Sequence, residues 1–165
     1  MSEAIERIKS RWAREGIAIR PGNSPEVLTA FEAKYGVVLP TAVRDYFAAV
    51  DGTGDAMDDG CFRFWPLAEV TSIDEYHGGE PEEDNWATGW FLFMDHLINS
   101  FFFAVWLTAD RSSGGAVGVP HGPRILLLAP NFEEFLELYA ADTMNLYGFS
   151  HLVDDIETPG NGGQG

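Results

Sequence analysis

The sequence has one cysteine, few basic residues and no long apolar run, and each scarcity excludes a class of protein. Cys61 has no second cysteine with which to form an internal bridge, so nothing points to an oxidising compartment. Only ten Lys and Arg oppose 26 Asp and Glu among 165 residues, which gives a formal charge of −16. Phosphate backbones and anionic lipid repel so acidic a chain. Direct binding to nucleic acid is therefore not expected.

The longest apolar runs, 90–94 and 101–107, are far shorter than the ~20 residues that a membrane-spanning helix needs. Charged and apolar residues alternate from Ser2 to Glu15, a pattern unlike that of a secretory signal. Together with the single cysteine, these features predict a cytoplasmic protein that does not bind membranes.

Histidine, cysteine and acidic residues are present, but their spacing matches no common catalytic or metal-binding motif. No two of the four histidines form the His-x-x-x-His pair that places two metal ligands on one helix face. The loop that begins at Asp51 has Ala56 and Phe62 where a calcium-binding loop needs Gly and Glu. Cys61 stands among aromatic residues, which favours a small core residue over a nucleophile. We therefore expect no enzyme, and no catalytic, cofactor-binding or metal-binding residues.

The charge that is present is unevenly distributed. Residues 51–165 carry twenty of the 26 acidic side chains and three of the ten basic ones, so their formal charge is −17. Like charges at this density cost stability, and solubility alone needs a magnitude of only about 2–8. Two interpretations stay open: an ordinary solubilising surface, or a surface that meets a strongly positive protein partner.

Apolar residues at spacings of three and four predict amphipathic helices in four segments. These segments are 2–15, 25–35, 41–50 and 131–142. Ser24 and Asn131 have the side chains of N-caps, and Pro25 suits a first helical position. Gly16 and Gly36 end the first two helices.

The middle of the chain favours strands. Aromatic and β-branched runs of strand length occur at 61–67, 89–95, 101–107, 116–119 and 124–128. A short helical turn is expected within 69–76, and a polar loop over 77–88. Because parallel pairing needs long crossovers, the short connectors predict an antiparallel meander.

The fold class is therefore α+β: a single domain in which N-terminal helices and a C-terminal helix flank an antiparallel twisted sheet. We expect this domain to span 1–156. The Gly-rich segment 157–165 should be a flexible C-terminal tail.

The order of these elements resembles that of the SMI1/KNR4 family of the SUKH superfamily over roughly residues 24–140. In that family an acidic-apolar helix ends in Gly, Leu-Pro begins the next helix, and Asn-Gly closes it. Glu32 to Gly36, Leu39-Pro40 and Asp51-Gly52 are similar to these motifs. The strand leading into a Pro-Leu-x-Glu-Val element, the central strands and the closing aromatic helix resemble segments 64–70, 90–95, 101–107, 117–119 and 129–139. The family's Gly-Asp-rich turn between central strands is replaced by the sequence DHLINS at 95–100.

This resemblance implies a binding module with no catalytic residues to carry over. Bacterial members are largely immunity proteins that neutralise secreted polymorphic toxins, often nucleases or nucleic-acid deaminases. Fungal relatives are regulatory interaction partners. The resemblance therefore implies a bacterial immunity protein that binds a basic toxin domain. The alternatives are an intracellular regulatory adaptor that inhibits no toxin, and a small enzyme or metal protein.

The acidic middle of the chain supplies the residues that we expect to bind such a partner. A toxin that acts on nucleic acid carries Lys and Arg, which carboxylates attract. Aromatic side chains inside the acidic stretch are candidate anchors, since such anchors carry most of the affinity of an interface. The predicted partner-binding residues are Asp55, Asp58, Asp59, Asp74, Glu75, Tyr76, Glu80, Glu82, Glu83, Asp84 and Trp86.

Overall fold

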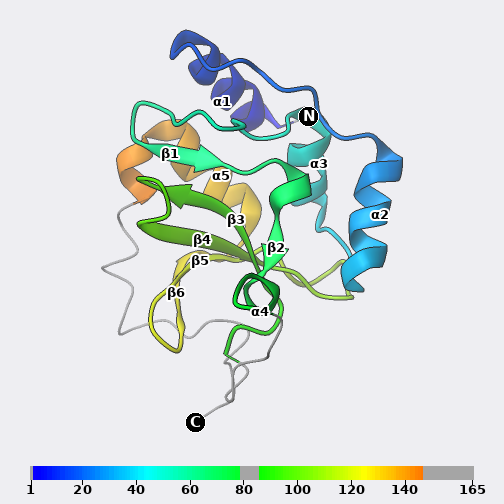
Figure 1. Ribbon diagram of the computed structural model, residues 1–165. Helices are drawn as coiled ribbons and strands as arrows, with labels where there is room; N and C mark the ends of the chain where they lie inside the picture. Colours follow the sequence, from blue (N-terminus) through cyan, green and yellow to red (C-terminus); the bar gives the residue numbers. More distant parts are fainter. Residues whose placement is uncertain (1, 79–85, 147–165) are drawn as a thin grey trace.

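The protein is an antiparallel β-sheet with most of its helices over one face (Figure 1). The computed structural model describes residues 2–78 and 86–146. Helix α5 lies between the sheet and α1. Helices α2 and α3 lie side by side at the right of the view, and α3 contacts α5 (Figure 1). The short helix α4 stands beside the sheet near β2 and β3 (Figure 1).

The helices begin where their caps predict. The α-helices are α1 (Glu3–Arg14), α2 (Pro25–Tyr35), α3 (Thr41–Ala49), α4 (Ile73–Tyr76) and α5 (Phe132–Ala141), and Leu67–Glu69 forms a 3₁₀ turn. Ser24 Oγ accepts the amide of Val27, and Asn131 Oδ1 accepts the amide of Glu134. Gly36 ends α2 in the left-handed conformation, with φ of 66°. All four predicted amphipathic helices are thus confirmed.

Six strands form one sheet. They are β1 (Phe62–Phe64), β2 (Thr71–Ser72), β3 (Trp90–His96), β4 (Phe101–Trp106), β5 (Val117–Pro120) and β6 (Ile125–Ala129). Strands β3 to β6 form the predicted meander, and both β1 and β2 pair with the other side of β3. The segment 69–76, expected to hold only a helical turn, also contains β2.

The strand register separates the sheet into two different faces. Phe64 pairs with Met94, which pairs with Phe103, and all three are fully buried on the side of α5. Because side chains alternate along a strand, the next row points the other way. That row runs from Arg63 to Asp95 and on to Phe102 across β1, β3 and β4. We call the face that carries it the outer face.

An aromatic core joins the sheet to the helices. The register of β3 shifts between Leu92 and Met94, so Phe93 faces α5 as Met94 does; its ring lies 5.7 Å from that of Phe132 and 5.4 Å from that of Phe135. Trp12 lies 5.1 Å from Phe64 and ties α1 to β1. Burying aromatic rings of this size removes about 150–250 Å² each from water. This core holds the outer face rigidly in place from behind.

Cys61 is one point where the structure corrects the sequence analysis. It was expected in the core, but it is only half-buried and its φ is 68°. Its amide donates to the carbonyl of Asp58, which closes a tight turn just before β1. The turn, and not the apolar interior, sets the place of this residue. The expected domain end at 156 and the tail 157–165 lie outside the described residues.

Candidate interaction surface

Four side chains, from β1 and the residue after it, from α4 and from β4, meet on the outer face. The Tyr76 ring lies 5.3 Å from that of Phe102, and the Trp65 ring lies 6.1 Å from Phe102 and 6.5 Å from Tyr76. The Arg63 guanidinium stands 5.4 Å above the Trp65 ring. Tyr76 is 46 % exposed, whereas Trp65 is only 5 % exposed. We call Arg63, Trp65, Tyr76 and Phe102 the aromatic surface.

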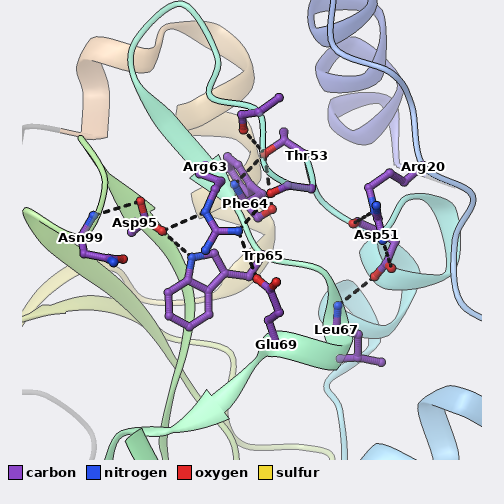
Figure 2. A network of polar contacts seen from close by, with 12 residues as sticks. Arg20, Asp51, Thr53, Arg63, Phe64, Trp65, Leu67, Glu69, Asp95 and Asn99 are labelled. Carbon is purple, nitrogen blue, oxygen red and sulfur yellow. Dashed lines mark hydrogen bonds and ion pairs between the residues drawn. The ribbon is translucent and has the colours of Figure 1, made fainter.

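A buried carboxylate holds this surface together (Figure 2). Asp95 is 1 % exposed, and its Oδ2 accepts from Arg63 Nε at 3.1 Å and from the Trp65 indole N–H at 2.6 Å. Arg63 Nη1 also donates to Glu69 and to the carbonyl of Gly54, both at 3.0 Å. A buried carboxylate needs such partners, because an unpaired one costs several kcal/mol. Arg63 and Trp65 are therefore fixed in a single geometry.

The loop 51–61, which precedes β1 and carries several Asp residues, is anchored beside the aromatic surface (Figure 2). Asp51 Oδ1 accepts the amide of Leu67 at 2.8 Å, and Thr53 Oγ1 donates to the carbonyl of Ala56 at 2.7 Å. Gly52 has φ of 71°, and a Cβ there would lie 2.4 Å from the carbonyl oxygen of Phe64. The loop is thus held against β1 and presents Asp55 to solvent.

The β3–β4 turn is the most unusual backbone in the described chain. Leu97, Ile98 and Asn99 have φ of 50°, 52° and 64°, although none of them is glycine. L-residues pay roughly 1–2 kcal/mol each in this region, and a β-branched residue is a genuine outlier there. Leu97 is 50 % exposed and Ile98 is 76 % exposed. A strained turn therefore holds two aliphatic side chains out in water.

Specific hydrogen bonds hold this turn and attach it to the aromatic surface. The Leu97 amide donates to the Cys61 carbonyl at 3.0 Å, and Ser100 Oγ donates to the Leu97 carbonyl at 2.9 Å. The Asn99 amide donates to Asp95 Oδ1 at 3.4 Å. Because the other oxygen of Asp95 binds Arg63, one carboxylate links the turn to the aromatic surface.

The predicted partner-binding residues do not all lie at the aromatic surface. Asp59 lies beside α1, where its amide donates to Glu15 Oε1 at 2.6 Å. Asp55 and Asp59 are exposed in the loop before β1, and Asp74, Glu75 and Tyr76 form α4. The Tyr35 hydroxyl bonds to Glu75 and, with the nearby charge of Lys34, lowers the pKa of that exposed carboxyl. Trp86 is half-buried and packs against the core. Glu80, Glu82, Glu83 and Asp84 lie outside the described residues.

Asp58 is a different case, and the prediction that it forms part of an exposed charged surface is wrong. It is 4 % exposed. Its Oδ1 accepts the amides of Gly60 and Phe62, at 2.8 and 2.9 Å, and its Oδ2 accepts the hydroxyl of Tyr139. The carboxylate is used inside the protein, where it closes the turn into β1.

Sequence reasoning missed Phe102, Leu97 and Ile98. Phe102 lies in a run of three phenylalanines whose outward member only the strand register identifies. The turn residues could have been found from the sequence, because Leu97 and Ile98 stand where the SMI1/KNR4 family often has a Gly-Asp-rich turn. An apolar residue where the backbone favours Gly is unfavourable for folding, and such strain concentrates at functional sites.

Of the described residues at the aromatic surface and the β3–β4 turn, Tyr76, Leu97 and Ile98 are exposed, whereas Phe102 is half-buried and Trp65 is buried. In the ranges 2–78 and 86–146, no group of three or more His, Cys, Asp or Glu is placed to hold a metal ion. Among the same residues, no helix combines the length and apolar character needed to cross a membrane.

The fold is that of an α+β domain whose six-stranded antiparallel sheet is flanked by N-terminal helices and a C-terminal helix. Residues 22–138 match the SMI1 / KNR4 family (SUKH-1), and the chain belongs to this family. SUKH proteins are typically immunity proteins and are generally non-catalytic. No curated protein matches the chain.

Proposed function

We propose that this protein is an immunity protein that binds and neutralises a cationic toxin domain through the aromatic surface and the adjoining β3–β4 turn. The observation that carries the proposal is the exposure of Leu97 and Ile98 on a strained, hydrogen-bonded turn. Family membership supports the kind of partner, since SUKH proteins are typically immunity proteins.

The turn has the physical properties of a binding anchor. Binding is most favourable when a side chain is already held in its bound position, because little conformational entropy is then lost. The bonds from Leu97 and Asn99 hold Ile98 in place before any partner arrives. Burying one such aliphatic side chain contributes roughly 1.5–3 kcal/mol. Leu97, Ile98 and Tyr76 are therefore the proposed anchors.

Charge supplies the speed of association. Toxins that act on nucleic acid must bear Lys and Arg to hold phosphates. The exposed carboxylates of Asp55, Asp59 and Glu75 and the half-buried carboxylate of Asp74 attract such residues. Electrostatic steering raises association rates toward about 10⁸–10⁹ M⁻¹s⁻¹ at low salt, against about 10⁵–10⁶ M⁻¹s⁻¹ for neutral pairs. The sequence-based assignment of Glu80 and the acidic run after it belongs to the same proposal.

The test needs a candidate toxin domain, to be sought in the genes that neighbour the one for this protein. Co-expression should rescue host growth, and the purified proteins should bind with an association rate that falls steeply as salt rises. Ile98→Gly and Tyr76→Ser should each weaken binding at least tenfold. Val27→Ser is the matched control, because Val27 is 47 % exposed on α2.

Three results would count against the proposal. Full rescue and unchanged affinity in Ile98→Gly and Tyr76→Ser would move the interface elsewhere. An association rate that does not change with salt concentration would show that electrostatic steering does not speed binding. Binding without rescue would favour the regulatory adaptor.

A further inference from the structure

We propose that two copies of this chain associate through the end of the molecule at which the β3–β4 turn, the loop before β1 and the end of α5 meet. The proposal does not depend on the toxin hypothesis. It rests on three features: exposed aliphatic side chains at this end, charges of both signs beside them, and a carboxylate that is placed unfavourably for its own helix.

The first feature is exposed apolar surface. Ile98, Met144 and Leu97 are 76 %, 65 % and 50 % exposed, which makes them the most exposed large apolar side chains of the described residues. We call these three side chains the aliphatic end. Single exposed apolar residues are ordinary, whereas several that share one patch mark an interaction site.

Contacts of the loop before β1 place the three side chains at one end of the molecule. The Leu97 amide donates to the Cys61 carbonyl at 3.0 Å. The neighbouring Gly60 lies against Thr143, the residue before Met144, because a Cβ on Gly60 would stand 3.1 Å from Thr143 Oγ1. The β3–β4 turn and the end of α5 accordingly lie on the same side of the molecule, at the left of the view (Figure 1). The aliphatic end is therefore one patch built from separate elements.

The second feature is the presence of both charge signs beside this patch. A hollow of about 610 Å³ next to Met144 is lined by Arg14 at the end of α1, by Asp59 and by Asp142. All three charged residues are exposed, and within the described part of the chain none of them forms an ion pair. The other two charged residues at the hollow pair with each other. An unpaired cation thus stands beside two unpaired anions.

Two-fold symmetry makes such a patch complementary to itself. In a two-fold interface, residue i of one copy contacts residue j of the other, and the reverse contact also forms. Arg14 of each copy would therefore meet Asp59 and Asp142 of the other, while the aliphatic ends pack together. The formal charge of −16 opposes association at long range. At physiological salt this repulsion falls off over about 8 Å, whereas the paired charges are in contact.

The third feature is the position of Asp142. It is the C-cap of α5, and the last turn of that helix has no basic residue. This end of a helix dipole is negative, so a carboxylate there is unfavourable and a cation is favourable. Asp142 Oδ1 accepts the Met144 amide at 2.9 Å, which orders the backbone but does not neutralise the charge. Arg14 of a second copy would supply the missing cation.

The experiment is sedimentation velocity of the purified chain over a concentration series at physiological salt. The patch is small, so we expect a weak dimer with a dissociation constant on the order of 10–100 μM. Met144→Ser and Arg14→Glu should each weaken this dimer at least tenfold. Val27→Ser and Arg124→Glu are the matched controls, because both residues are exposed and lie on other elements. Both controls should leave the dimer unchanged.

A charge exchange tests the pairing directly. Neither Arg14→Glu nor Asp59→Arg/Asp142→Arg should dimerise alone, because like charges then meet at both symmetric contacts. An equimolar mixture of the two variants should regain the dimer, because opposite charges meet again. Circular dichroism of each variant separates loss of association from loss of the fold. Tyr76→Ser should keep the dimer, so failure of the toxin interface is distinguishable from failure of this proposal.

Each other outcome overturns the proposal. A monomer throughout a series that extends well above the expected dissociation constant would show that this end binds no second copy. A dimer that Met144→Ser and Arg14→Glu leave intact would lie on another surface. Equal loss in Arg124→Glu would assign the effect to net charge. A mixture of the exchanged variants that stays monomeric would show that the proposed ion pairs do not form.

Discussion

The Tyr139 hydroxyl donates to the buried carboxylate of Asp58 and accepts from the Trp12 indole N–H at 2.8 Å. These three residues come from α5, the loop before β1, and α1. Arg11 stands 4.2 Å above the Tyr139 ring and donates to the carbonyl of Ala140. One buried phenol thus joins α1 and α5 to the loop that leads into β1.

Replacing Tyr139 should therefore destabilise the fold. Tyr139→Phe leaves the buried Asp58 carboxylate and the Trp12 N–H without this partner, which costs about 1–3 kcal/mol. Tyr46→Phe is the matched control, because the Tyr46 hydroxyl is buried without a hydrogen-bond partner among the described residues. Its removal should cost under about 0.5 kcal/mol or stabilise. Urea unfolding measures both, and equal losses in the two variants would contradict the prediction.

The same two tyrosines predict a loss of stability in alkali. Burial raises the pKa of Tyr139 above its ordinary value, and the charge of Asp58 raises it further. Burial also raises the pKa of Tyr46. Above a pH of about 10 the unfolded chain releases these protons while the folded chain keeps them, so the free energy of unfolding falls.

The decline should begin near pH 10 and reach at most about 1.4 kcal/mol per pH unit for each tyrosine. Unfolding measured from pH 8 to 11.5 tests this, with tyrosinate absorbance as a second readout. Tyr139→Phe should show a shallower decline than the wild type. An identical slope in the variant would assign the alkaline loss to other groups.

The pair formed by Arg63 and Asp95 predicts strong coupling. Arg63→Met leaves the Asp95 carboxylate buried without its cation and should cost about 3–5 kcal/mol. In Arg63→Met/Asp95→Asn the side chain at 95 is neutral and still accepts from Trp65, so the double variant should regain more than about 1 kcal/mol. A double-mutant cycle in urea measures this. Simple additivity of the two single effects would show that the pair is not coupled.

The strained turn predicts that one substitution stabilises the protein. Ile98→Gly removes a β-branched side chain from a left-handed position. The strain relieved is about 1–2 kcal/mol, and the added freedom of the unfolded chain offsets about 0.4–1 kcal/mol of it. We expect a net gain of about 0.5–1 kcal/mol in thermal or urea unfolding.

Val27→Gly is the control, because Val27 is also a β-branched residue that is exposed, here within a helix. Glycine should there destabilise by up to about 1 kcal/mol. A loss of stability in Ile98→Gly comparable to that in Val27→Gly would mean that the turn is not strained. A gain in stability combined with weaker toxin binding would indicate that the strain serves recognition.

The helices and strands were predictable because their signals are local. Ser24, Asn131 and Gly36 define helix ends within three or four residues of sequence. Short connectors between aromatic runs were sufficient to predict the meander, since short connectors favour antiparallel pairing. The two-residue strand β2 was missed because so short a segment carries no periodicity of its own.

The candidate site was less accessible to sequence reasoning. An acidic residue in a polar loop is expected to be exposed, and Asp59 is exposed. Its neighbour Asp58 instead points inward and accepts a hydrogen bond from Tyr139, which lies 81 positions later in the sequence. No residue near Asp58 in the sequence predicts that hydrogen bond. The exposure of Ile98 likewise depends on a turn that is held from Cys61 and Asp95.

The sequence by itself determined the α+β class, the helix boundaries and the negative charge, because propensity, periodicity and composition act over a few residues or simply add. Only the tertiary structure decided which carboxylates face water, which residues form the aromatic surface, and that β1 and β2 pair with the side of β3 opposite β4. These properties depend on groups distant in sequence that compete for the same partners and the same burial. Which groups become paired or buried is therefore decided only when the whole backbone is folded.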